Sequence, residues 1–286
     1  MIRLRTMTKS DIPSGMRLKE IAGWNQTAED WMRFLDTNEG GCFIAEVDGK
    51  VRGTVTTIAY EKRFAWVGMV LVDPEYRGKG LGTKLLEIAI ECLLNAKIAS
   101  IKLDATPQGM PLYEKLGFQC EYEIERWILK RTPEMAAQTD ENPSRQAISE
   151  RVLEMILAED REVFGSDRSQ LLKSLRQSAP EFTGAVWENA TLRGSAFGRR
   201  GSFADHLGPW MAKDADAASE LLKSFIARSR REVLLVDRLK SNIIAGDLLR
   251  SMGFEYSRPL TRMYLGANQH PGRTENLCAI VGPEFG

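Results

Sequence analysis

The stretch Val70-Leu71-Val72-Asp73-Pro74-Glu75-Tyr76-Arg77-Gly78-Lys79-Gly80-Leu81-Gly82 decides which fold this chain can adopt. The apolar run over residues 65–72 predicts a buried strand, and Pro74 ends it. Residues 83–95 carry apolar side chains at helical spacing and predict a helix. Glycines let the backbone approach a ligand, and a helix start presents free N–H groups and a positive dipole end. Arg77 and Lys79 add positive charge, so the stretch predicts a pyrophosphate site.

Other phosphate-binding loops fit this stretch less well. A Walker loop requires Gly-x4-Gly-Lys followed by Ser or Thr, and the chain contains no such spacing. The dinucleotide fingerprint Gly-x-Gly-x-x-Gly would place its third glycine at Thr83 and fails by one position. A glycine-rich turn without a ligand is disfavoured, because basic residues, glycines and a helix start coincide here.

The order Arg77-Gly78-Lys79-Gly80-Leu81-Gly82 resembles the acetyl-CoA loop of the GCN5-related N-acetyltransferases, the GNAT family. The resemblance implies acetyl-CoA as cosubstrate, with its pantetheine arm paired to the preceding strand like an added strand. The cofactor-binding residues expected on this basis are Met69, Val70, Leu71, Val72, Arg77, Gly78, Lys79, Gly80, Leu81, Gly82, Thr83 and Thr106. Thr106 departs from the family pattern, which often has Asn at that place, so a side-chain contact from it to the cofactor is in doubt.

The resemblance also assigns chemistry to three parts of the chain. Backbone N–H groups near Met69 and Leu71 would polarise the thioester carbonyl. Tyr113 falls at the family's position for the residue that protonates the departing CoA sulfur, and a phenol is protonated at neutral pH. Half-buried helix packing is the alternative for this tyrosine. Trp24, Asn25 and Trp66 fall in regions that border the acceptor in this fold, where aromatic walls could grip an aliphatic amine or simply fill the core.

The general base is left open by the sequence. A primary amine with a pKa of about 10 is almost entirely protonated at neutral pH, so its proton must be removed. The chain has two histidines, His206 and His270, and both are expected to be structural or on the surface. Glu61, Asp104 and a chain of waters are equally defensible.

The length and composition limit the classes of protein to which this chain can belong. A length of 286 residues predicts two domains, and 39 basic against 39 acidic side chains argue against a nucleic-acid partner. The four cysteines are scattered without a Cys-x-x-Cys pair, so neither a metal site nor a disulfide framework is expected. The chain begins without an apolar signal core and has no run long enough to span a bilayer, which predicts a cytoplasmic protein without a membrane partner. Its oligomeric state is left open.

The first half predicts an α/β fold with a mixed sheet, in the order β-α-α-β-β-β-α-β-α-β-β that the GNAT family has. Strands are expected at residues 2–5, 42–47, 51–60, 65–72 and 98–103, with closing strands within 118–129. Helices are expected at 11–22, 27–35, 83–95 and 112–116. A polar, proline-bearing stretch then predicts a linker, giving a catalytic domain at 1–133, a linker at 134–146 and a second domain at 147–286.

The second half reads as a degenerate copy of the first. A shift of 136 residues aligns Gly117-Phe118 with Gly253-Phe254 and Arg126 with Arg262. The same shift places Asp214 and Asp216 opposite Gly78 and Gly80, and two carboxylates would repel a pyrophosphate. The predicted helix at 215–228, strand at 233–236 and helix near 245–252 recur in the right order.

The whole chain also resembles bacterial tandem acetyltransferases, in which a full GNAT domain precedes a degenerate one. The motifs that carry this likeness are Gly23-Trp24-Asn25, the glycine loop, Leu103-Asp104-Ala105-Thr106-Pro107-Gln108-Gly109 and Leu207-Gly208-Pro209. We therefore expect an acetyl-CoA-dependent N-acetyltransferase that acts on a small-molecule amine by direct attack in a ternary complex, with one cofactor per chain. The alternatives are acetylation of a protein N-terminus or lysine, and a non-catalytic acyl-CoA sensor.

Overall fold

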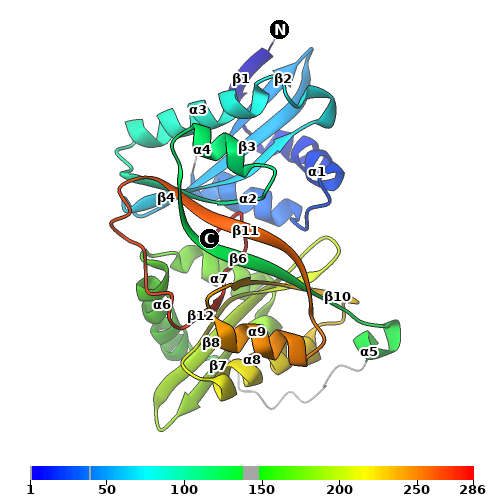
Figure 1. Ribbon diagram of the computed structural model, residues 1–286, viewed down its shortest axis with the longest axis vertical. Coiled ribbons are helices and arrows are strands. Elements are labelled where there is room, and N and C mark those ends of the chain that lie inside the picture. The colour runs from blue at the N-terminus through cyan, green and yellow to red at the C-terminus, as the bar shows by residue number, and fades with distance from the viewer. Residues whose placement is uncertain (1, 39, 138–147) are drawn as a thin grey trace. The chain divides into compact units, whose positions relative to one another are not determined.

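The computed structural model describes residues 2–38, 40–137 and 148–286, which form two compact units (Figure 1). Unit 1 comprises Met1–Cys120, Met263–Gln269 and Glu284–Gly286. Unit 2 comprises Glu121–Arg262 and His270–Pro283. Each unit is an α/β structure, as the sequence predicts, and the described strands of both belong to one 12-stranded mixed sheet. None of the described helices has the length and apolar character needed to cross a membrane.

The elements of unit 1 follow the predicted order closely. Its strands are β1 (Ile2–Thr6), β2 (Phe43–Val47), β3 (Lys50–Tyr60), β4 (Phe64–Val72) and β5 (Ser100–Ala105). Its helices are η1 (Lys9–Asp11), α1 (Ile12–Ile21), α2 (Ala28–Thr37), η2 (Pro74–Tyr76), α3 (Leu81–Asn95) and α4 (Met110–Lys115). The sheet order is β1-β2-β3-β4-β5, and β11 (Glu255–Gly266) lies beside β5. Pairing is antiparallel from β1 to β4 and parallel between β4 and β5.

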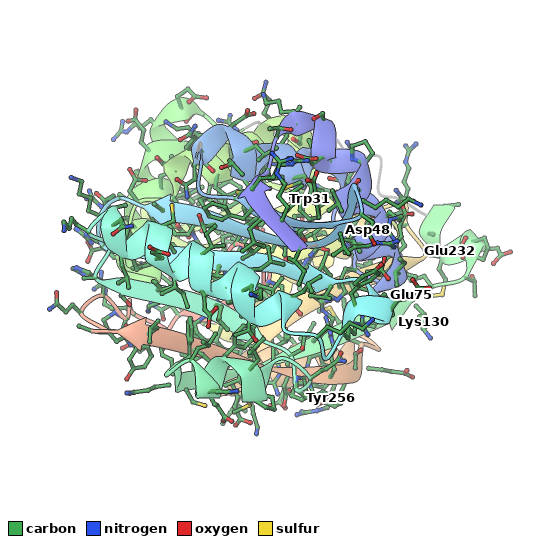
Figure 2. The ribbon with its side chains drawn as sticks, turned by 90° about the horizontal axis from the view of Figure 1, so that it is seen from above. Trp31, Asp48, Glu75, Lys130, Glu232 and Tyr256 are labelled. Atoms are coloured by element: carbon green, nitrogen blue, oxygen red, sulfur yellow. The ribbon has the colours of Figure 1, made fainter. Side chains whose placement is uncertain are left out.

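Local chemistry explains these elements. Thr27 and Asp30 form a capping box that starts α2, because the Thr27 N–H donates to the Asp30 carboxylate at 2.8 Å. Asp48 and Gly49 both have positive φ, which the two-residue turn between β2 and β3 requires. Helix α3 buries one side against β2, β3 and β4, and α1 and α2 cover the other face of the sheet (Figure 2).

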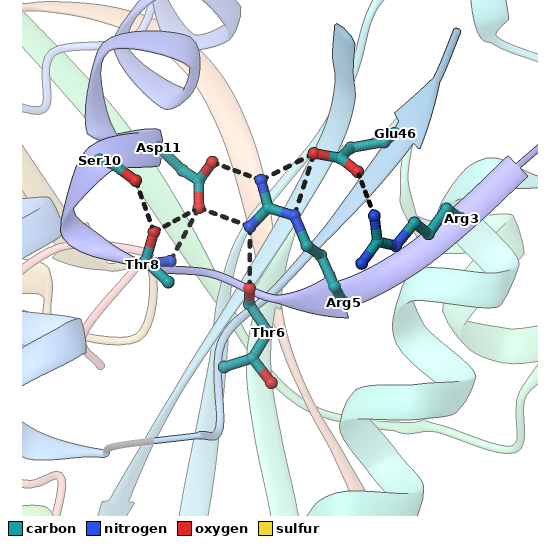
Figure 3. A network of polar contacts seen from close by, with 7 residues as sticks. All are labelled: Arg3, Arg5, Thr6, Thr8, Ser10, Asp11 and Glu46. Carbon is teal, nitrogen blue, oxygen red and sulfur yellow. Dashed lines mark hydrogen bonds and ion pairs between the residues drawn. The ribbon is translucent and has the colours of Figure 1, made fainter. Parts of the chain in front are cut away.

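A network of ion pairs fastens the start of the chain. Arg5 of β1 donates to both carboxylate oxygens of Asp11 at 2.8 Å and to Glu46 of β2 at 2.7 Å (Figure 3). Hydrogen bonds from Arg5 lower the pKa of Asp11 to about 2. An open cavity of about 510 Å³ beside this network is lined in part by Arg17, Lys50 and Arg52. The hydrogen bonds of Arg5 therefore join β1 to β2 and to the start of α1.

Unit 2 contains a second set of strands and helices of the same type. Its strands are β6 (Gln119–Lys130, in this unit from Glu121), β7 (Gly184–Glu188), β8 (Thr191–Arg200), β9 (Asp205–Ala212), β10 (Val233–Leu239), β12 (Leu277–Ala279) and β11 up to Arg262. Its helices are α5 (Pro133–Ala137), α6 (Glu150–Phe164), α7 (Ser169–Ser178), η3 (Pro180–Phe182), α8 (Ala215–Arg228) and α9 (Ile243–Ser251). The sheet order is β11-β6-β10-β12-β9-β8-β7. The duplication predicted from the sequence is confirmed, since β6 and β11 differ by the same shift of 136 residues.

The expectation of more than one closing strand within residues 118–129 is wrong. A single strand, β6, runs from Gln119 to Lys130. The segment contains no Gly, Pro, Asn or Asp that could make a turn, so the alternation continues unbroken. Unit 1 obtains its further strand from β11 instead, whose residues from Met263 onward belong to that unit.

The compact units are discontinuous in sequence, whereas the prediction places contiguous domains at 1–133 and 147–286. The first segment of unit 1 ends at Cys120, and two later segments return to it. Within the predicted linker 134–146, residues 134–137 belong to α5. Residues 138–146 of that linker lie outside the described residues.

Candidate functional site

Strand β4 separates from β5 at the position predicted to hold the cofactor arm, while it stays paired with β3. Its pairing with β5 covers Ala65 with Ile101 and Trp66 with Lys102. The register with β3 then shifts between Thr54 and Thr56, and Met69 has a φ of +48°, which is unusual for a residue with a side chain. The Thr54 hydroxyl donates to the Met69 carbonyl at 2.8 Å and holds this bulge. The end of β4 therefore has backbone groups that β5 does not use.

The turn after β4 is fixed by Asp73. Its carboxylate accepts hydrogen bonds from Arg17 at 3.1 Å, from Arg52 at 2.9 Å and from the Glu75 N–H at 3.3 Å. Burial opposes ionisation of Asp73, but the hydrogen bonds from Arg52 and Arg17 prevail and hold its pKa below the usual value. These hydrogen bonds fix the turn that leads from β4 into the glycine loop.

The glycine loop has the backbone geometry that the sequence predicts. Gly78 and Gly80 have φ values of +71° and +79°, and a Cβ placed on either would meet no atom within 4 Å. Gly80 is the N-cap of α3 and has no side chain to occupy the helix start. The first helical bond runs from the Lys84 N–H to the Gly80 carbonyl at 3.1 Å. The N–H groups of residues 81–83 therefore precede the helical ladder and can bind an anion.

Cations gather around this loop. The Arg77 Nε donates to the Val72 carbonyl at 3.2 Å, which holds its guanidinium beside the turn. The Lys79 ammonium lies 4.9 Å and the Arg52 guanidinium 4.7 Å from the centre of the Tyr76 ring. An open glycine turn, a helix start without a side-chain cap and neighbouring cations fit a pyrophosphate. Arg52 was not expected here, because it lies in β3 and only the folded hairpin brings it to the loop.

Tyr113 lies in α4, next to the same loop. A Cβ placed on Gly82 would be 3.6 Å from Leu112, so α4 and the start of α3 are in contact range. The Tyr113 ring packs edge-on against Phe118 at 5.9 Å, and its hydroxyl makes no hydrogen bond to the described residues. Burial raises the pKa of Tyr113 to about 12. The phenol is therefore protonated at neutral pH, as a general acid requires.

Thr106 has a local structural role. Its hydroxyl accepts a hydrogen bond from the Gly109 N–H at 3.2 Å, just before α4. Asn242, its counterpart in unit 2, accepts from the Ala245 N–H at 3.0 Å at the start of α9. Both side chains thus fasten the turn before the same helix, and a contact from Thr106 to the cofactor stays a prediction.

The residues predicted to border the acceptor differ in their surroundings. Trp24 is half-buried and Asn25 is buried, both directly after α1. Trp66 is 0% exposed, and its contact with an acceptor stays a prediction. Of the candidate bases, Glu61 pairs with Arg63 at 3.2 Å, and Asp104 lies half-buried in β5.

Both histidines lie in unit 2. His206 is buried in β9, with its Nε2 3.1 Å from the Asp237 carboxylate. Asp237 also accepts two hydrogen bonds from Arg126, at 2.8 and 2.7 Å. This arrangement holds β6, β9 and β10 together. Among the described residues there is no group of three or more His, Cys, Asp and Glu side chains that could hold a metal ion.

Unit 2 fills its own helix start. Asp214 is the N-cap of α8, and its carboxylate accepts a hydrogen bond from the Ala217 N–H at 2.9 Å. Arg193 donates to the same carboxylate at 2.6 and 2.9 Å. A negative charge and its own counter-ion therefore occupy the place that an anion would take in unit 1.

Two family models match the chain in tandem. The acetyltransferase (GNAT) family model matches residues 11–118, and an acetyltransferase (GNAT) domain model matches residues 156–279. Among curated proteins, the holothin acyltransferase of Pseudoalteromonas sp. is 25% identical, with 92% of this chain and 87% of that protein covered. The uncharacterized N-acetyltransferase YitH of Bacillus subtilis is 26% identical, with 95% and 94% covered.

Solved structures show the same fold. A putative acetyltransferase from Pyrococcus horikoshii has a TM-score of 0.81 at 20% identity, with 100% of this chain and 96% of that chain covered. A GCN5-related N-acetyltransferase from Sphaerobacter thermophilus has a TM-score of 0.67 at 19% identity, with 93% and 95% covered. The chain is an acyltransferase of the GNAT family, and it contains two GNAT-type domains in tandem.

Proposed function

We propose that unit 1 transfers an acetyl group from acetyl-CoA to the primary amine of a small molecule, by direct attack within a ternary complex. The observation that carries this proposal is the combination of three neighbouring features in unit 1. A bulged strand end with free backbone groups leads into an open, cation-flanked glycine turn, and a buried, protonated tyrosine lies on the neighbouring helix.

Each part has a task in this reaction. The glycine loop and the start of α3 bind the pyrophosphate, and the end of β4 pairs with the pantetheine arm. Acetyl-CoA supplies an activated thioester. The backbone N–H groups near Met69 and Leu71 donate to its carbonyl oxygen, where negative charge develops as the amine nitrogen attacks.

Proton balance assigns a role to Tyr113. As the new C–N bond forms and the C–S bond breaks, the nitrogen loses a proton and the CoA sulfur gains one. Tyr113 donates its phenolic proton to the sulfur and is reprotonated from solvent. The proton from nitrogen leaves to a base or to water.

The Asp214 carboxylate occupies the start of α8 in unit 2. This supports one cofactor site per chain, in unit 1. The Pseudoalteromonas relative is named for acyl transfer to holothin, and we take that name as support for a small-molecule acceptor. We expect the protein to act in the cytoplasm. No metal ion has a part in this proposal.

The test uses the full chain with acetyl-CoA, and it measures cofactor binding by calorimetry and CoA release by thiol titration. A panel of small primary amines is compared with peptides that carry a free N-terminus or a lysine. Faster CoA release with small amines supports the proposal. Release with peptides alone would make the acceptor a protein, and binding without release by any acceptor would make the chain a sensor.

A further inference from the structure

The segment Glu284–Gly286 lies in unit 1, against the bulged part of β4. A Cβ placed on Gly68 would be 2.8 Å from the Glu284 carbonyl oxygen, 3.2 Å from its Cα and 3.3 Å from its Cβ. Only glycine at position 68 permits this approach. Because Gly68 directly precedes Met69, the Glu284 side chain begins beside the place where we locate the thioester carbonyl.

Phe285 anchors this segment. Its carbonyl accepts a hydrogen bond from the Tyr60 hydroxyl at 2.7 Å, and its ring stacks on Phe34 of α2 with centroids 4.7 Å apart. The side chain is 0% exposed. The segment is therefore a fixed part of unit 1, and Glu284, which is 2% exposed, is held in place by its neighbour.

A buried hydroxyl lies on the same part of the sheet. Thr56 of β3 pairs with Gly68 of β4, so the two residues are direct neighbours across the strands. Thr56 is 0% exposed, and its Oγ1 has no hydrogen-bond partner among the described residues. An unsatisfied buried hydroxyl costs free energy, and a polar ligand would remove that cost.

We propose that Glu284 and Thr56 form the acceptor-binding end of the active site in unit 1, and that it takes amines in their cationic, alkylammonium form. The proposal rests on the proposed function. A carboxylate beside the acyl position attracts an ammonium group and, at hydrogen-bond range, can accept its proton. The Thr56 hydroxyl accepts a second N–H and so orients the nitrogen towards β4.

This site explains why the base was not evident in the sequence. Glu284 is more than two hundred positions away from Met69, in no recognisable motif. The side chain reaches unit 1 only because the chain returns to it after unit 2.

The test compares Glu284→Gln, Glu284→Asp and Thr56→Val with the unaltered full chain. Glu87→Gln, on an exposed side of α3, is the matched control. Two acceptors are used at neutral pH, namely an alkylamine that transfer assays have shown to be active and an arylamine that carries no charge. Acetyl-CoA affinity and thermal unfolding are measured for every variant.

We expect Glu284→Gln to raise KM for the alkylamine tenfold or more, while KM for the arylamine and acetyl-CoA affinity stay unchanged. Glu284→Asp should recover part of the loss. Thr56→Val should raise KM for the alkylamine without lowering the unfolding temperature. An unchanged alkylamine KM in Glu284→Gln, or equal losses for both acceptors, would overturn the inference while the proposed function stands. If the transfer assays find no amine that the unaltered chain acetylates, the proposed function itself fails.

Discussion

The carboxylate of Asp214 accepts the N–H of Ala217 at 2.9 Å and so caps α8 of unit 2. Gly80 occupies the same place at the start of α3 in unit 1 and offers no side-chain acceptor. The two units thus share a fold and differ at the helix start where we propose that a diphosphate binds. This difference makes the units chemically unequal.

The first prediction concerns stoichiometry. One acetyl-CoA should bind per full chain, because α3 begins at Gly80 without a side-chain cap, whereas its counterpart α8 begins at the Asp214 carboxylate. Asp214→Ala should leave this stoichiometry at one and should destabilise unit 2 by about 1 kcal/mol through loss of the cap. Calorimetric titration and denaturant unfolding measure the two effects. A stoichiometry of two in either protein would contradict the prediction.

The second prediction separates two glycines of the loop. Gly80→Ala forces an alanine into a left-handed conformation at about 1–2 kcal/mol, and it narrows the anion site. We expect the Kd for acetyl-CoA to rise by about tenfold. Gly82→Ala is the control, since its Cβ would make ordinary contacts of 3.6 Å with Leu112 and Val72. Equal affinities in the two variants would argue against the loop as the binding site.

The third prediction concerns Tyr113. Tyr113→Phe removes the proton donor but keeps the ring that packs on Phe118. We expect kcat to fall by about 10²–10⁴-fold, with the affinity for acetyl-CoA nearly unchanged. Tyr264→Phe, which loses only a hydrogen bond to Gln119, is the matched control and should keep its activity. A Tyr113→Phe variant with normal kcat would assign this tyrosine to packing alone.

The fourth prediction is the alkaline limit of activity. Because burial raises the pKa of Tyr113 to about 12, the acid stays protonated well above the pH at which a free phenol ionises, about 10. The rate should therefore show no fall caused by ionisation of Tyr113 below about pH 10. A pH–rate profile measured with acetyl-CoA at saturation checks this. A descending limb near neutral pH that Tyr113→Phe abolishes would contradict it.

The fifth prediction concerns acid stability of unit 2. Burial lowers the pKa of His206, so the folded state binds its proton less readily than the unfolded state does. Folding stability should consequently fall as the pH drops below about 6.5, the ordinary histidine value. His206→Gln should flatten this loss between about pH 6.5 and 5. His270→Gln, which replaces the other histidine, is the control, and an unchanged slope in both variants would contradict the prediction.

The loop and its flanking elements could be predicted because their signals are local. One short stretch contains the strand that ends at Val72, the glycines at 78 and 80 and the helix that ends at Asn95. Helical spacing and glycine positions suffice to define such a unit. The strand, turn and helix of the proposed cofactor site could therefore be predicted from the sequence.

The long-range contacts on either side of β4 could not be predicted, because their residues meet only through distant pairing. Glu284 reaches Gly68, and Arg52 reaches Tyr76, without any spacing rule that links them. The partner of β5 is β11, and an alternating pattern does not tell which strand it will pair with. Hydrophobic periodicity was enough to predict most of the strands, whereas their long-range pairing partners could be identified only from the structure.

The discontinuity of unit 1 has a consequence for synthesis on the ribosome. Residues 1–120 emerge first, but the strand segment at Met263 emerges after most of unit 2, and the Phe285 anchor emerges after all of it. Domains usually fold as they leave the ribosome, from the N-terminus onward. Here unit 1, which contains the glycine loop, keeps an open sheet edge while unit 2 is synthesised, and it is completed last.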